Sequence, residues 1–368
     1  MNVLKKINLN ILQFDRILNV NGNFDIIKRT LKIGNNNACI YYIDGFIKDN
    51  ALQEIIRFML LTGENKMSEV KNISDYLDNL LPYMEVSVEQ EFEEASKELL
   101  SGCVVLFIDG LNEAIIVDAR TYPQRQIQEP EQDKVLRGAR DGFIETPIFN
   151  MVLVRRRIRN ENLTFECQKI GEKTQNDVVI GYMSDKVDKK RLELVKKKLD
   201  EMKPNDLSMG IASLIEAMFP KKYLNPFPKA KLTSRPDVVS ASLLEGRIVL
   251  FVDNTPCAAI LPTYFWDFFQ EAGDYYFTPP IALYLKITRY MIGFLTVFLT
   301  PLWLLAIKNM DILPEWLKFL NVQEWNSIPL ILQLLAMEFV IDVLRQASIN
   351  TPSMISTSIS LIGAIIIR

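Results

Sequence analysis

The stretch VVLFIDGLNEAIIV, residues 104–117, places two short apolar runs on either side of an Asp-Gly pair. Runs of four to eight apolar residues bounded by turn residues are typical of buried strands. An Asp-Gly turn between two such runs favours a β-hairpin. This stretch therefore predicts two paired, buried strands.

The same strand pattern occurs on both sides of that hairpin. Ala38–Ile43 is an apolar run that ends at Asp44-Gly45, and residues 248–261 repeat the hairpin pattern around Asp253-Asn254. Alternating polarity predicts further strands at 163–170 and 177–183. Helical spacing of apolar residues predicts helices at 52–61, 70–83, 88–100, 141–156 and 188–202, the last beginning at a capping Asp188. The proline-containing stretch 219–237 is predicted as a loop.

These elements predict a cytoplasmic α/β region of two small subdomains, followed by an α-helical transmembrane domain. The expected boundaries are an N-terminal segment at 1–37, a first α/β subdomain at 38–120, a linker at 121–140, a second α/β subdomain at 141–275 and a transmembrane region at 282–368. The linker is predicted because prolines, glutamines and charges replace apolar runs there.

The composition excludes several classes of function. The chain has 368 residues and no histidine, which rules out a Ser-His-Asp or Cys-His catalytic site and a zinc site built on imidazole. A formal net charge of −3 argues against a dedicated nucleic-acid binder. The sequence contains no phosphate-binding glycine loop and no nucleophile elbow. We therefore expect no enzyme, no catalytic residue, no cofactor and no metal.

The four cysteines, Cys39, Cys103, Cys167 and Cys257, are widely spaced, and three of them lie in or beside apolar runs. We expect buried, reduced thiols, because the spacing supports neither a metal site nor a disulfide framework. The N-terminus has no continuous apolar run of the kind found in a secretory signal, so the N-terminal region is expected in the cytoplasm.

The C-terminal quarter of the chain is predicted to cross a membrane. The aromatic stretch TYFWDFFQEAGDYYF, residues 263–277, is typical of a bilayer interface. Spans are predicted at 287–307 and 328–347, with a partial span at 353–367. Lys286 and Arg289 place the start of the first span on the cytoplasmic side. The last run would cover only about 22 Å, so the membrane domain is expected to be incomplete in this chain.

Three charged residues of the second predicted span, Glu338, Asp342 and Arg345, share one helical face. Because a charge in hydrocarbon is costly, these side chains should face other helices or water. They could line an ion path or form an ionic lock between subunits. A local Asp342–Arg345 pair that only secures helix packing explains them equally well.

Other charged groups leave alternatives open. Two basic clusters, Arg155–Arg159 and Lys186–Lys198, could bind nucleic acid or anionic lipid, or could be solvated faces with neighbouring acidic partners. The strand-end residues Asp44, Asp109 and Asp253 could hold Mg²⁺, although turn chemistry explains them without a metal.

The segment DARTYPQRQIQEPEQDKVLRGARDGFIETPIFNMVLVRRRIRN, residues 118–160, resembles the signature region of the GerA family of spore germination proteins, A-subunit type. NPFPKAKLTSRPDVVSASLLEGRIVLFVDNTP at 225–256 and MEFVIDVLRQA at 337–347 resemble further blocks of that family. The DARTYP wording and the tail IPLILQLLAMEFVIDVLRQASINTPS are similar to a sporulation-associated branch, linked to the machinery that releases dipicolinic acid.

The resemblance implies an integral protein of the spore inner membrane, multi-pass, with its large N-terminal region on the cytoplasmic (core) side. It implies a subunit of an oligomeric, ligand-gated ion channel, which we expect to be a homo-oligomer. The implied partners are other spore membrane germination proteins and the lipid bilayer, and no nucleic acid is expected as a partner. The alternative is a non-conducting scaffold that recruits germination proteins through its α/β region. Six matched signature residues are expected at contacts between subdomains or subunits: Arg137, Arg140, Glu145, Arg155, Arg156 and Arg157.

Overall fold

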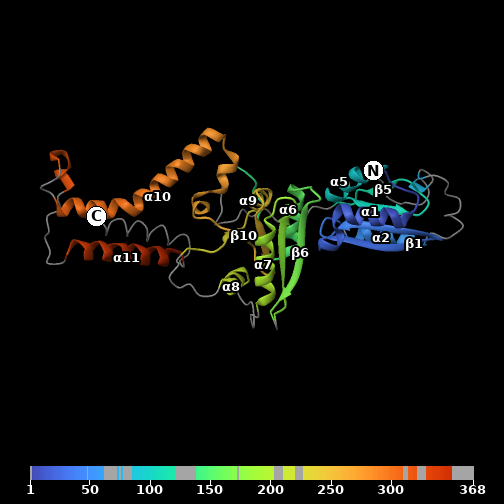
Figure 1. Cartoon of the computed structure of the whole chain (residues 1–368), viewed down its shortest axis with the longest axis horizontal. Coiled ribbons are helices and arrows are strands. Elements are labelled where there is room, and N and C mark those ends of the chain that lie inside the picture. The colour runs from blue at the N-terminus through green and yellow to red at the C-terminus, as the bar shows by residue number, and fades with distance from the viewer. Residues whose placement is uncertain are drawn as a thin grey trace. The chain divides into compact units, whose positions relative to one another are not determined.

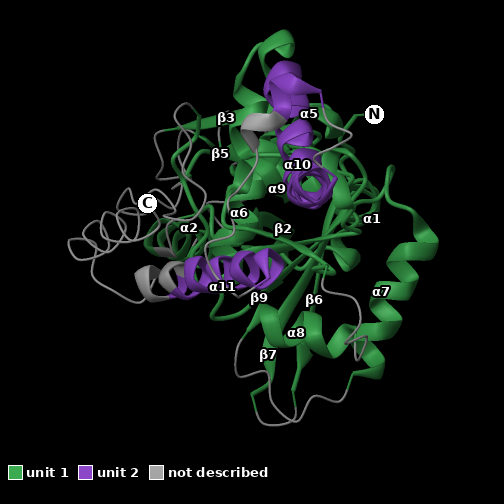
Figure 2. Cartoon of the chain, turned by 90° about the vertical axis from the view of Figure 1, so that its left-hand side faces the viewer, with its two compact units in different colours: residues 1–282 green, residues 283–368 purple. Residues whose placement is uncertain are grey.

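The computed structural model describes residues 2–47, 49–61, 73, 76–77, 85–120, 138–171, 174–202, 210–219, 227–309, 314–320 and 329–349. The chain divides into two compact units, Met1–Ala282 and Leu283–Arg368 (Figure 2). Each unit is described by itself. The predicted helix at 70–83 lies mostly outside the described residues, as do residues 121–137 of the predicted linker and the whole predicted span at 353–367.

The first unit contains two five-stranded sheets (Figure 1). The first sheet has the strand order β1-β2-β4-β5-β3, and every one of its ladders is antiparallel. Its elements are α1 (Ile7–Leu18), the 3₁₀ turn η1 (Val20–Gly22), β1 (Ile26–Ile33), β2 (Asn36–Ile43), α2 (Asp49–Leu61), β3 (Val86–Glu89), α5 (Phe92–Leu100), β4 (Val104–Ile108) and β5 (Ala114–Val117).

Helices cover both faces of this sheet. Successive residues of a strand point to opposite faces. Tyr41 and Phe107 pack with Phe14 of α1 and with α5, whereas Ile40 and Leu106 pack with α2 on the other side. Burial on both faces explains why β4 and β5 are continuous apolar runs with no polar position.

The second sheet has the order β6-β7-β9-β10-β8 and is also antiparallel throughout its described ladders. Helices α6 and α9 pack on one face and α7 and α8 on the other. The elements are α6 (Pro147–Arg157), β6 (Leu163–Ile170), β7 (Asn176–Met183), α7 (Lys189–Glu201), α8 (Ile211–Met218), β8 (Lys231–Thr233), α9 (Pro236–Leu244), β9 (Ile248–Val252) and β10 (Ala258–Leu261).

The two sheets repeat one topology. In each, a helix precedes a long hairpin, a short strand joins the far edge, and a nine-residue helix leads into a second hairpin. Side-chain detail repeats as well. Asn10 of α1 accepts a bond from Leu4 N at 2.8 Å and donates to Leu4 O at 2.6 Å, and Asn150 of α6 makes the same pair of bonds to Ile144.

The hairpins expected at 104–117 and 248–261 are present, and Asp188 caps α7 by accepting a bond from Lys190 N at 3.0 Å. Some boundaries differ. The first sheet begins with β1, inside the segment 1–37 that the sequence set apart from the first subdomain. The predicted helix 88–100 starts only at Phe92, because residues 86–89 form edge strand β3.

Two further predicted boundaries differ for reasons of proline chemistry. The helix expected from residue 141 begins at Pro147, since proline is favoured in the first turn, where its missing N–H is not needed. The predicted loop 219–237 contains β8, and α9 begins with Pro236 for the same reason. Both sheets are antiparallel, so the architecture is two helix-covered antiparallel sheets.

The second unit is helical in its described part. Helix α10 (Pro279–Lys308), which starts at the end of the first unit, has 30 residues, and no residue of it is buried. It is the one helix among the described residues long and apolar enough to cross a membrane. It changes direction along its length (Figure 1), and Pro301 inside it is a physical cause of a kink. A 3₁₀ segment, η5 (Glu315–Leu320), and helix α11 (Leu330–Ile349) follow.

Candidate functional site

Arg155 of α6 lies fully buried between the two sheets of the first unit. Its guanidinium donates from Nε to Asp25 Oδ2 at 2.6 Å and from Nη2 to Asp25 Oδ1 at 2.9 Å. The exposed fractions of the two side chains are 0% and 2%. A bidentate pair of this kind fixes the relative orientation of the two side chains as well as pairing their charges, because Nε and Nη2 must each meet one carboxylate oxygen. Asp25 stands immediately before β1, so this pair joins the two sheets.

The remaining polar atoms around Arg155 are also satisfied. Its Nη1 donates to Leu163 O at 3.1 Å, and its guanidinium carbon lies 5.1 Å from the centre of the Phe165 ring. The backbone of Phe165 is held by the first sheet: its N–H donates to Asn23 Oδ1 at 3.0 Å, and its carbonyl accepts from Phe24 N at 2.8 Å. The chain entering β1 therefore bonds directly to β6.

An apolar contact accompanies this polar one. Val152 of α6 belongs to the core cluster of the first sheet rather than that of the second. It packs beside Gly45, where an added Cβ would lie 2.8 Å from Val152 Cγ2 and where φ is +83°. Glycine is required at this position for both reasons. We name Asn23, Asp25, Gly45, Val152, Arg155 and Phe165 the inter-sheet junction.

The other predicted signature residues are in different surroundings. Arg157 donates from Nη2 to both carboxylate oxygens of Asp141, at 2.7 and 2.6 Å, in a partly exposed pair. Arg140, Glu145 and Arg156 are exposed at the surface of the chain. Arg137 lies outside the described residues. The structure thus brings one of the six, Arg155, between the sheets.

A second buried arginine was not singled out from the sequence. Arg235 has a fully buried side chain that donates to Asp237 at 3.1 and 2.6 Å and to Ala139 O at 2.9 Å. Tyr276 donates its hydroxyl to the same Asp237 and accepts from Ala139 N at 3.2 Å. Gly138, with φ +134°, lies against the Tyr276 ring, where a Cβ would come within 2.5 Å. We name Gly138, Ala139, Arg235, Asp237 and Tyr276 the Tyr276 latch. It joins the described end of the signature region, at Gly138 and Ala139, to the segment before α10.

The acid in this latch is held ionised. Burial alone would raise the pKa of Asp237, but hydrogen bonds from Arg235 and Tyr276 outweigh it, so that the pKa is lowered overall. Burial and the bond to Asp237 raise the pKa of Tyr276. A charged acceptor between two donors is a strong arrangement.

A third arginine holds the aromatic stretch that the sequence placed at a bilayer interface. Arg247 donates to both oxygens of Asp267, at 2.7 and 3.0 Å, and Asp267 Oδ2 accepts from Tyr264 N at 2.8 Å. These bonds fix the 3₁₀ segment η2 (Phe265–Phe269). Arg191 of α7 adds a bond to the Tyr264 hydroxyl at 2.9 Å.

The second basic cluster is largely paired within the first unit. Lys196 lies 2.6 Å from Glu166, and Lys197 lies 3.6 Å from Glu201. Lys198 donates to Met218 O at 3.2 Å, and Lys186 donates to Leu244 O at 3.0 Å. The reading as solvated faces with local partners fits these contacts.

The three charged residues of the second predicted span, Glu338, Asp342 and Arg345, all lie on α11. Glu338 and Asp342 are one turn apart and exposed, and the side chain of Arg345 is outside the described part. Neighbouring apolar side chains of α11 are exposed too, among them Phe339 at 69%. With three charges in 20 residues, α11 is less apolar than α10.

The described residues offer little chemistry for catalysis or metal binding. Within the described ranges, no three cysteine or carboxylate side chains gather closely enough to hold a metal ion. Asp109 Oδ1 accepts a bond from Ile7 N at 3.0 Å, a structural use of a strand-end carboxylate. The four cysteines form no disulfide with one another, and burial raises the pKa of Cys39 to about 11 and that of Cys103 to about 12. The thiols of Cys39 and Cys103 are therefore poor nucleophiles at neutral pH.

The comparisons with known proteins agree on one family. A family model described as Bacillus/Clostridium GerA spore germination protein matches residues 13–368. Stage V sporulation protein AF of Bacillus subtilis is 33% identical over 344 residues, which cover 94% of this chain and 69% of that protein. Spore germination protein KA of the same organism is 31% identical, over 95% of this chain and 64% of its own. The chain thus spans about two thirds of the length of these relatives.

A solved structure matches the first unit's architecture. The N-terminal domain of the A subunit of the Bacillus megaterium spore germinant receptor GerK3 is 26% identical, with a TM-score of 0.56. The match covers 72% of this chain and 98% of that domain. The expected resemblance, including its sporulation-associated branch, is confirmed by these relatives. The chain belongs to the GerA family of Bacillus/Clostridium spore germination proteins.

Proposed function

We propose that this chain is a membrane subunit of a bacterial spore germination complex that contributes to an oligomeric ion channel and releases ions during germination. The observation that carries the proposal is the pair Glu338 and Asp342, one turn apart on the mostly apolar helix α11. Intramembrane carboxylates are costly unless they face water or partners, and they commonly mark ion paths.

The exposure of the second unit supports assembly in a bilayer. Side chains along α10, such as Phe294, Val297 and Leu302, are 61%, 64% and 58% exposed. A helix that is apolar all round is stable only when lipid or other helices cover it. Further copies of the chain, the bilayer and other spore membrane germination proteins are the partners that this requirement favours. In this proposal the first unit lies on the cytoplasmic (core) side of the spore inner membrane, and the basic residues Lys286 and Arg289 near the start of α10 support that orientation.

The test is ion flux through proteoliposomes that contain the purified full chain, compared with Glu338→Gln and Asp342→Asn. Removal of one carboxylate from a water-filled path should change cation conductance several-fold, because a ring of carboxylates sets the local cation concentration. Glu193→Gln, the same chemical change at an exposed position of α7, serves as the matched control and should leave flux unchanged.

An absence of flux from protein shown to be inserted and oligomeric would contradict the conducting role. The alternative is a non-conducting scaffold that recruits germination proteins through the first unit. The inter-sheet junction favours this scaffold role, because a buried ion pair that joins the two sheets gives partner proteins a rigid binding surface. In that case changes at Glu338 or Asp342 alter assembly, measured by crosslinking, without any conductance to alter.

A further inference from the structure

The segment before α10 inverts the usual distribution of polarity in a folded domain. In η2, the acid Asp267 is 5% exposed, whereas Phe265 and Trp266 are 52% and 59% exposed. Phe268 is 44% exposed, and Phe227, from the chain before β8, is 55% exposed. Aromatic side chains in this number normally lie inside, so their collective exposure points to an apolar partner.

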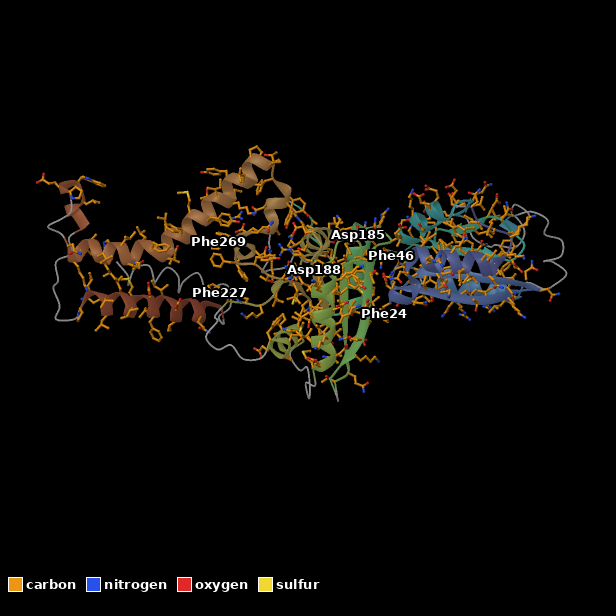
Figure 3. All side chains as sticks on the ribbon, viewed as in Figure 1. Phe24, Phe46, Asp185, Asp188, Phe227 and Phe269 are labelled. Atoms are coloured by element: carbon orange, nitrogen blue, oxygen red, sulfur yellow. The ribbon has the colours of Figure 1, made fainter. Side chains whose placement is uncertain are left out.

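Phe227, Phe265, Trp266 and Phe269 form one cluster, and Phe268 belongs to the same 3₁₀ segment. The Phe265 ring lies 5.8 Å from Phe227, 5.5 Å from Trp266 and 5.3 Å from Phe269, in edge-to-face arrangements. Figure 3 shows Phe227 and Phe269 on the same side of the second subdomain. We name Phe227, Phe265, Trp266, Phe268 and Phe269 the aromatic platform.

The platform is held in place by the buried acid beneath it. Asp267 is fixed by both nitrogens of Arg247 and caps η2 through Tyr264 N. The Arg247 guanidinium also lies 5.6 Å from the centre of the Tyr264 ring. Because Asp267 alone of this 3₁₀ turn points inward, its neighbours in sequence must point outward. The exposure of the aromatics is thus built into the fold and is not the result of a loose segment.

The bilayer is the partner that fits this surface. Phe269 precedes Pro279, the first residue of α10, by ten positions, so the platform lies within about 35 Å of the start of that helix even for a fully extended chain. The platform combines four phenylalanines with Trp266, and Tyr264 lies beside it; tryptophan and tyrosine are enriched at the membrane–water interface. Arg191 bonds to Tyr264 and lies 3.2 Å from Asp188; its half-exposed guanidinium is a cation near the platform that lipid phosphates can approach.

We propose that the aromatic platform seats the first unit on the lipid–water interface of the membrane that α10 enters. The occupant of the platform is the headgroup and upper acyl region of that bilayer. This inference rests on the proposed membrane location of α10. It adds a second, rigid point of attachment that belongs to the second subdomain.

The test uses the full chain in lipid vesicles, with Trp266 as the only tryptophan after Trp303, Trp316 and Trp325 are changed to phenylalanine. Vesicles contain phosphatidylcholine and phosphatidylglycerol, brominated either near the top of the acyl chain or near its end. We expect shallow bromine to quench Trp266 fluorescence more strongly than deep bromine, and the bilayer to protect Trp266 from acrylamide in water.

A matched reporter controls for quenching by proximity alone. In it, all four tryptophans are phenylalanine and Phe58 is tryptophan; Phe58 lies on α2 of the first subdomain and is 37% exposed. This reporter should be open to acrylamide and insensitive to brominated lipid.

Two results for Trp266 would overturn the proposal. Access to acrylamide without quenching by lipid would show a platform in water, and protection from both quenchers would show a platform covered by protein, such as a second copy.

Carbonate extraction of the same vesicles separates this proposal from that of the preceding subsection. A chain that resists extraction while Trp266 is not quenched contradicts only the seating of the platform. A chain that is released while shallow bromine quenches Trp266 supports the platform and contradicts the membrane-spanning role of α10. Release without quenching contradicts both.

Discussion

Asp25 and Arg155 are separated by 130 positions in the chain, yet neither can change alone without leaving a buried charge unpaired. Asp25→Asn should lower the free energy of unfolding by about 3–5 kcal/mol, because the guanidinium would keep its charge without a counter-ion. Urea unfolding of the detergent-solubilised full chain, followed by circular dichroism, measures this loss.

The control for this substitution is Asp141→Asn, which breaks the partly exposed pair with Arg157. That change should cost about 1 kcal/mol or less, since water screens the charges. The double variant Asp25→Leu with Arg155→Met removes both charges and should be less destabilising than Asp25→Asn. Equal losses for the buried and the partly exposed pair would contradict the role given to the inter-sheet junction.

The sequence identified Arg155 but not its partner. Arg155, Arg156 and Arg157 stand together in the signature, and nothing in their spacing tells which one faces inward. Asp25 belongs to a polar segment with weak periodicity, and its role depends on a contact between distant parts of the chain. Arg235 and Arg247 lie inside a block that resembles the family. From sequence alone, however, an arginine near an acidic residue is explained equally well by an exposed ion pair and by a buried one.

At the scale of secondary-structure elements, the Tyr276 latch joins α9 to the last turn before α10. The lowered pKa of Asp237 gives this contact a pH dependence. A carboxylate whose folded pKa lies below its unfolded value of about 3.9 stabilises the fold above that pH, and its contribution is lost as the pH falls through the folded pKa.

We therefore expect the free energy of unfolding to decrease as the pH falls below about 4, and Asp237→Asn to weaken that dependence. Urea titrations at several pH values between 3 and 6 measure it. Asp185→Asn, at an exposed carboxylate, should leave the pH dependence as in the wild type. If the free energy of unfolding changes with pH equally in the wild type and in Asp237→Asn, the Tyr276 latch does not contribute to the pH dependence of stability.

Elements were predictable where burial imposes a clear pattern. Strands β4, β5, β9 and β10 lie inside sheets covered on both faces, so that their residues are all apolar. Strand β1 lies at a sheet edge and carries exposed Lys28, Arg29 and Thr30 in its middle, which hides the alternation of a strand. Strand β8 has three residues, too few for any periodicity.

At the scale of the whole molecule, the repeated topology of the two sheets makes a paired prediction. Asn10→Ala and Asn150→Ala each remove a side chain that satisfies both backbone groups of the residue six positions earlier. Each should lower the free energy of unfolding by about 1–3 kcal/mol, since buried backbone groups lose their partners. Urea unfolding of both variants should give losses within about 1 kcal/mol of each other. A loss confined to one position would show that the two asparagines make the same hydrogen bonds but do not contribute equally to stability.

The recurring strand-and-turn pattern predicted several similar hairpins, but it did not show that α1 corresponds to α6. That correspondence depends on the buried asparagines and on equal strand order, which only the folded chain reveals. Of the predicted membrane region, the long apolar helix α10 was predictable, because the 18 residues from Tyr290 to Ile307 carry no charge.

The inter-sheet junction also orders events during protein synthesis. Arg155 follows Asp25 by 130 codons. A ribosome adds about 5–20 residues per second, so Arg155 is made roughly 6–26 s after Asp25. During that interval the nascent first sheet holds an acid without its guanidinium and lacks Val152 from its core. A chaperone that shields this half-finished surface would be needed only until α6 has emerged from the ribosome. The first sheet therefore completes its core only after α6 of the second subdomain has been translated.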